Sequence, residues 1–111
     1  DLNIDHQLTN SATMIACRPL PNSTVKEIYG FEVLSSTEWS NFQKETFNPK
    51  FFVDITDYMT KKINALKEYK DELRYPPHSR SIQHVEVIAK HRGYSIGVNM
   101  AEAFEIYRII N

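Results

Sequence analysis

The sequence contains few of the features that would assign a protein to a class at first sight. Cys17 is its one cysteine, so the chain can form neither an internal disulfide nor a zinc cage built from cysteines. No stretch approaches the roughly 18 consecutive apolar residues of a membrane-spanning helix. The first ten residues have neither the basic nor the apolar region of a secretory leader. Together these absences predict a cytoplasmic protein without a membrane span.

A strong charge of one sign is also missing. The 111 residues include 13 Lys and Arg against 14 Asp and Glu, which gives a formal net charge of −1. Proteins that bind nucleic acid by neutralising phosphates carry an excess of basic residues, so nucleic acid is not an expected partner. The chain is 41% hydrophobic and 24% charged, values that are typical of a folded domain. The length allows one domain.

Hydrophobic periodicity predicts helices and strands in alternation. Helices are expected from His6 to about Arg18, from Asp54 or Thr56 to just before Tyr75, and from a cap at Ser81 to Arg92 with Gly93 as C′ residue. Strands are expected over Lys26–Leu34 and over 51–53, while the tail at 101–110 fits either a helix or a strand.

This alternation predicts an α/β fold with a mostly parallel sheet flanked by helices. Only about three strands are visible in the sequence, and a small α/β domain normally needs more of them to cover its helices. We therefore expect the chain to be part of a larger sheet.

Two histidines lie in segments where chemistry is expected. His6 follows Asp5 beside a helix start, and active sites of α/β folds lie where strands lead into helices. His78 lies near Arg80 in a short loop between two helices. Purely structural roles remain open for both: Asp5 as a helix cap with His6 as a bystander, and Arg80 as a cap for backbone carbonyls.

A long polar loop is expected at 35–50, and such loops often contain binding or catalytic residues. It includes Trp39 and exceeds the roughly 12 residues beyond which loops are usually functional or disordered. Together with the two loop histidines and nearby carboxylates, it suggests a metal-assisted hydrolase, in which zinc polarises a carbonyl and activates water. The chain by itself supplies few ligands for such a metal.

Several segments, in order and spacing, resemble the PIG-L/LmbE-like metal-dependent N-deacetylases. FEVLSSTEW (31–39) is similar to that family's FEVPSSTEW, and FNPKFFVDI (47–55) is similar to its FNPNVFVDI. Further matches are YKDELR (69–74), PHSRS (77–81), AEAFE (101–105) and NIDH (3–6), which corresponds to an HxDH-type motif. The resemblance covers the chain from its first residues to its last segment.

The resemblance implies a Rossmann-like fold and a zinc site that removes N-acetyl groups from GlcNAc-containing substrates. His6 would be a ligand of Zn²⁺, and Asp5 and His78 would take part in catalysis, with His78 near the oxyanion. Asn3, Arg80 and Trp39 would contact the sugar substrate. Asn3 stands where the family has a histidine, although its amide can still donate a hydrogen bond.

The family's N-terminal AHPDDE motif is absent from these 111 residues. That motif supplies the other metal ligands and the general base, so residues 1–111 would form a single partial domain, the C-terminal portion of such an enzyme. The chain alone is then expected to be inactive, with the N-terminal half or a second copy of the chain as partner. The alternative is a non-catalytic α/β interaction module that binds a partner through the Trp39 loop and an exposed sheet edge.

Overall fold

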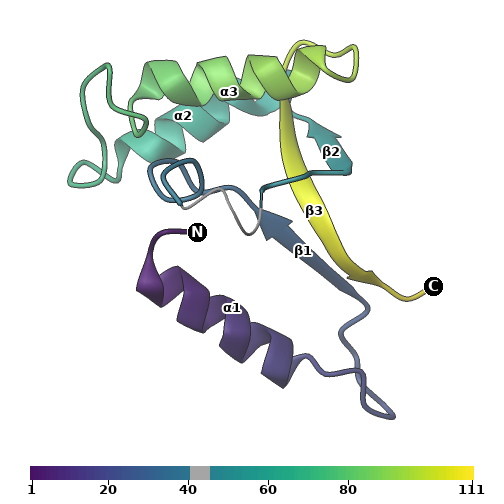
Figure 1. The fold of residues 1–111 in the computed structure, drawn as a ribbon. Coiled ribbons are helices and arrows are strands. Elements are labelled where there is room, and N and C mark those ends of the chain that lie inside the picture. Colours follow the sequence, from purple (N-terminus) through teal and green to yellow (C-terminus); the bar gives the residue numbers. More distant parts are fainter. Residues whose placement is uncertain (41–45) are drawn as a thin grey trace. The chain divides into compact units, whose positions relative to one another are not determined.

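The computed structural model describes residues 1–40 and 46–111, which form two compact units (Figure 1). Unit 1 comprises Asp1–Lys50 and Phe104–Asn111, and unit 2 comprises Phe51–Ala103. Among the described residues, no helix combines the length and apolar character needed to cross a bilayer. Each unit is described below by itself.

The strands form one antiparallel sheet, and the expected Rossmann-like, mostly parallel arrangement is wrong. The strands are β1 (Glu27–Phe31), β2 (Phe51–Asp54) and β3 (Ala101–Ile109), in the order β1-β3-β2. β1 pairs antiparallel with β3, from Glu27 opposite Ile109 to Phe31 opposite Phe104. At the two ends of β2, the Lys50 N–H donates to the Phe104 carbonyl and the Ile55 N–H donates to the Met100 carbonyl. The residue numbers rise on one strand as they fall on the other, so β2 and β3 are also antiparallel. The ambiguous tail therefore becomes the central strand.

Helix α1 (Ile4–Ala16) of unit 1 begins earlier than the sequence indicated. Asn3 is its N-cap residue, and the helix ends before Pro19, which cannot continue it. No residue of α1 is buried, and its apolar stripe is open: Ile4, Leu8 and Ile15 are 70%, 63% and 60% exposed. The described residues do not cover this apolar face.

Pairing between β1 and β3 gives unit 1 its few interior contacts. Ile28 is the one buried hydrophobic side chain in the described part of this unit. The rings of Tyr29 and Phe104 meet edge to face with centroids 6.4 Å apart. The hydroxyl of Tyr29 donates a hydrogen bond to Glu27, which raises the pKa of Tyr29. Unit 1 therefore depends on its sheet pairing and turns more than on a core.

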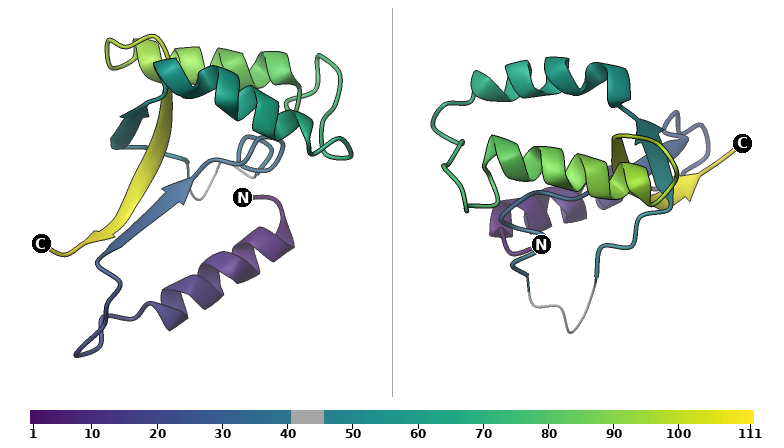
Figure 2. Two further views of the ribbon diagram at one scale, coloured as in Figure 1. Left: turned by 180° about the vertical axis from the view of Figure 1, so that it is seen from behind. Right: turned by 90° about the horizontal axis from the view of Figure 1, so that it is seen from above.

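Unit 2 contains the hydrophobic cluster of the chain. A 3₁₀ turn, η1 (Thr56–Tyr58), leads into α2 (Met59–Lys67), and α3 (Ile82–Tyr94) lies beside α2 (Figure 2). The buried cluster consists of Ile55, Met59, Ile63 and Ala89, with Ile82, Val85 and Met100 packed against it. Met59 and Ile63 of α2, and Ile82, Val85 and Ala89 of α3, recur at helical spacing and so form one apolar face on each helix.

Both helices of unit 2 differ from the sequence prediction at their C-terminal ends. α2 ends at Lys67 rather than just before Tyr75, and turns follow it. Ser81 caps α3 as expected, because its hydroxyl accepts the His84 N–H at 3.3 Å. Gly93, expected beyond the helix, lies inside it, and the left-handed glycine is Gly97 with φ 81°. Gly93 is required for close packing, because a Cβ there would lie 2.7 Å from the backbone of Met100.

The hydrogen bonds of Asp54, just before η1 and α2, lead to a testable prediction about its pKa. An oxygen of Asp54 accepts hydrogen bonds from the Thr56 hydroxyl at 2.6 Å and the Thr56 N–H at 2.9 Å, and these lower the pKa of Asp54 below 3.8. Because the pKa of Asp54 is lower in the folded chain than in the unfolded chain, its carboxylate stabilises the fold at pH values above the unfolded pKa. This stabilisation is lost as the pH falls through the pKa of the folded state. Thr56→Val should raise the Asp54 pKa toward 3.8 in an NMR titration. An unchanged pKa would show that the backbone bond alone holds it.

Candidate functional site

Three of the residues singled out from the sequence lie together at the start of α1. The Oδ1 atom of Asn3 accepts a hydrogen bond from the Asp5 N–H at 2.8 Å, which caps the helix. Asp5 lies in the first turn, where the helix dipole favours a carboxylate. His6 follows in the same turn, so it lies inside the helix rather than in a loop that precedes it. The NIDH motif therefore forms the N-cap and the first turn of α1.

The ring of His6 is oriented by Asp1, a residue that the sequence reasoning did not single out for the site. His6 Nδ1 lies 3.0 Å from Asp1 Oδ2, while Asp1 Oδ1 accepts the Asn3 N–H at 2.8 Å. The side chain of Gln7 donates to the Asp1 carbonyl at 2.7 Å and holds the same residue from the helix. The side chain of His6 is 39% exposed. Nε2 is therefore the ring nitrogen on the side away from the carboxylate.

The loop that contains Trp39 is attached to this segment by the backbone. The Leu2 N–H donates to the Ser36 carbonyl at 3.0 Å, and Ser36 is buried. Trp39 is 52% exposed. Unit 1 thus brings the Trp39 loop beside the residues that orient His6. Part of the long loop expected at 35–50, residues 41–45, lies outside the described residues.

His78 and Arg80 lie in unit 2, in the loop before α3. His78 Nδ1 accepts the Arg80 N–H at 3.0 Å, which puts the proton of a neutral ring on Nε2. The Arg80 guanidinium forms an ion pair with Glu72, a partner that the sequence did not suggest. Arg80 Nε and Ser79 Oγ are buried and have no hydrogen-bond partner among the described residues.

The described residues do not contain a complete metal site. Within residues 1–40 and 46–111, no three His, Cys, Asp or Glu side chains are grouped closely enough to hold an ion. The donor set at the start of α1 fits one ligand of a zinc site, because a carboxylate holds one nitrogen of the histidine ring and the other faces away.

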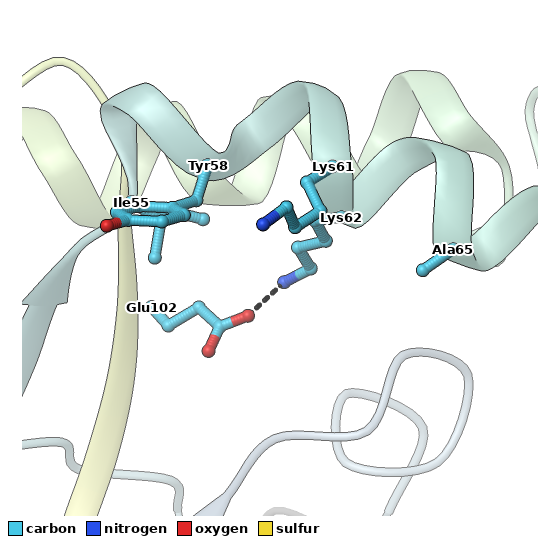
Figure 3. A pocket seen from close by; sticks show the side chains of 6 residues that line it. All are labelled: Ile55, Tyr58, Lys61, Lys62, Ala65 and Glu102. Carbon is cyan, nitrogen blue, oxygen red and sulfur yellow. Dashed lines mark hydrogen bonds and ion pairs between the residues drawn. The ribbon is translucent and has the colours of Figure 1, made fainter.

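A hollow of about 250 Å³ lies beside α2 in unit 2, and none of the candidate catalytic, sugar-binding or metal-binding residues lines it (Figure 3). It is lined by Ile55, Tyr58, Lys61, Lys62, Ala65 and Glu102. Lys62 pairs with Glu102 at 2.5 Å, and the Lys61 ammonium lies 5.9 Å from the Tyr58 ring centroid. Its charges are thus largely engaged with one another or with the Tyr58 ring.

Comparison with known proteins gives no significant match: no family model, no curated protein and no solved structure matches the chain.

Proposed function

We propose that the chain is the C-terminal portion of a zinc-dependent N-deacetylase of the PIG-L/LmbE-like kind, which removes the acetyl group from a GlcNAc-containing substrate. The order and spacing of the motifs support the family. Because the sheet is antiparallel, the proposal rests on those motifs and on the site, and takes nothing from a Rossmann-like fold.

The observation that carries the proposal is the contact between His6 and Asp1. Metal-binding histidines usually have their second ring nitrogen held by a carboxylate or a carbonyl, which fixes the tautomer and raises the basicity of the ligand. His6 has this arrangement through its Nδ1 atom, 3.0 Å from Asp1 Oδ2. A histidine that was only a bystander at a helix start would not need a carboxylate on its ring and a second hydrogen bond that holds that carboxylate in place.

Each candidate residue of this chain would have a separate role in such a reaction. His6 would bind Zn²⁺ through Nε2, and the bound ion supplies a Lewis acid that polarises the acetamide carbonyl and activates water. Asp5 lies next to His6 and is exposed, so its carboxylate could assist catalysis there, while the general base would come from the family's N-terminal motif. The family resemblance also assigns an oxyanion-binding role to His78, which lies in unit 2. Asn3 and Trp39 would orient the sugar, and the resemblance assigns the same role to Arg80 in unit 2.

The proposal is tested on the longest expressible form of the protein that includes residues upstream of Asp1. We expect this form to retain about one zinc ion per chain and to release acetate from a GlcNAc-containing substrate, with loss of both in His6→Ala. A complete protein that retains no zinc, or that releases acetate equally well after removal of zinc by a chelator, would contradict the proposal.

The isolated 111-residue chain should bind zinc weakly and should not turn over substrate. The reason is that the described residues offer one metal ligand of a set that normally has three. Isothermal titration with zinc and an acetate-release assay on the purified chain measure both properties. Micromolar zinc affinity or amide hydrolysis by this chain alone would show that it already contains a working site.

A second candidate function, a non-catalytic interaction module, is favoured by one observation. The apolar stripe of α1 is exposed along its length, and β1 and β2 are the edge strands of the described sheet. Such surfaces bind proteins. Under this alternative His6→Ala changes nothing, whereas Leu8→Asp in the centre of the stripe weakens binding to a partner.

A further inference from the structure

The loop that contains Trp39 is shaped by two side chains that hydrogen-bond to its own backbone. Thr37 Oγ1 accepts the Val33 N–H at 2.8 Å, and Glu38 Oε1 accepts the Ser35 N–H at 2.6 Å. Ser35 has a φ of 70°, in the left-handed region that residues other than glycine rarely adopt. The turn is therefore held in an unfavourable backbone conformation by these two side chains together with two backbone hydrogen bonds, from the Ser36 and Thr37 N–H groups to the Val33 carbonyl at 3.0 and 2.9 Å.

This turn presents one backbone group to the N-terminal segment. The Ser36 carbonyl accepts the Leu2 N–H at 3.0 Å, and Ser36 is only 8% exposed, which shields the bond from competing water. Leu2 lies between Asp1, whose carboxylate holds the His6 ring, and Asn3, whose amide caps α1. The bond from Leu2 thus links the conformation of the turn to the position of the carboxylate that orients His6.

We propose that Thr37 and Glu38 are positioning residues for His6. They touch neither the metal nor the substrate; they fix the turn, the turn fixes the Ser36 carbonyl, and that carbonyl fixes the segment from Asp1 to Asn3. The part of this inference that concerns zinc rests on the proposed function, whereas the part that concerns the orientation of His6 does not.

The positioning role is tested first on the 111-residue chain by NMR. Thr37→Val and Glu38→Ala should each make the Leu2 amide exchange with solvent about tenfold faster, because the loss of one supporting hydrogen bond is worth about one factor of ten. The ¹⁵N resonances of the His6 ring should shift at the same time. Thr37→Ser and Glu38→Gln keep the accepting oxygen and should restore both signals. Thr9→Val, an exposed threonine of α1, is the matched control.

The same variants are then compared in the complete protein. Thr37→Val and Glu38→Ala should raise the zinc dissociation constant about tenfold, in the range for groups that orient a metal ligand, with kcat largely kept at saturating zinc. The conservative variants should restore the affinity.

Three results would overturn the inference. Faster exchange at Val33 and Ser35 with an unchanged Leu2 amide and unchanged His6 ring would show that the turn is not coupled to the N-terminal segment. An effect on His6 without any change in zinc affinity would show that this coupling does not serve the metal. Failure of Thr37→Ser and Glu38→Gln to restore the signals would assign the effect to general destabilisation. If the wild-type complete protein binds no zinc, the proposed function fails while the NMR comparison still decides the coupling.

Discussion

His6→Ala is expected to abolish zinc retention in the complete protein, a larger loss than the roughly 10–100-fold that follows substitution of a group in the outer shell. Alanine removes the ring that would donate Nε2 to the metal, and no other histidine of the described chain lies at the start of α1. The measurement is zinc content after dialysis, followed by competitive titration with a chelator. His91→Ala, an exposed histidine of α3, is the matched control and should retain zinc fully.

Asp1→Asn should give the intermediate result. The amide keeps the size of the side chain but withdraws the charge that holds His6 Nδ1, so zinc affinity should fall by about 10–100-fold rather than vanish. The order wild type, Asp1→Asn, His6→Ala therefore separates orientation from ligation. Equal zinc affinity in wild type and His6→Ala would remove His6 from the metal site.

Gly93→Ala is expected to lower the free energy of unfolding by about 2 kcal/mol, even though alanine in a helix interior is favoured over glycine by about 1 kcal/mol. The added Cβ would lie 2.7 Å from Met100 N and 2.8 Å from Asn99 C. These are backbone atoms of the turn that follows α3, where the Val98 N–H also bonds to the Gly93 carbonyl. The clash can be relieved only by moving the turn or the helix. Urea unfolding followed by circular dichroism measures the loss.

Gly30→Ala is the matched comparison, because its Cβ would also meet a neighbour at 2.8 Å. That neighbour is the ring end of Tyr107, a side chain 45% exposed, which can turn away into solvent. We therefore expect a loss of about 1 kcal/mol or less, smaller than at Gly93. A neutral or stabilising Gly93→Ala would show that helix propensity outweighs the contact and that the turn after α3 is easily displaced.

The positions of the main elements could be predicted from the sequence, whereas the way the strands pair could not. Helical spacing of apolar residues located α1 and α3, and Ser81 was correctly expected to cap α3. Strand pairing is set by contacts between residues far apart in the chain, such as Phe31 with Phe104. Alternating helices and strands favoured a parallel sheet, but the last strand lies in the middle and runs antiparallel to both neighbours.

The residues of the candidate site could be predicted from a sequence motif, but the contacts between their side chains could not. The sequence drew attention to Asn3, Asp5 and His6, and the structure shows that they share the first turn of α1 or its cap. The role of Asp1 was missed because it depends on how the chain turns into the helix, which brings a carboxylate back to the histidine five residues later. A carboxylate just before a capped helix that contains a histidine was the signal for it. Gly93 was misplaced for a similar reason, because its contact lies on a distant turn.

The most direct test of the account is a crystal structure of the zinc-loaded complete protein with a GlcNAc ligand. We expect zinc about 2.0–2.1 Å from His6 Nε2, with Nδ1 of the same ring still bound to Asp1 and the acetamide of the ligand facing the metal. A zinc ion bound elsewhere, or a His6 ring whose Nε2 faces away from the metal and the sugar, would contradict the account.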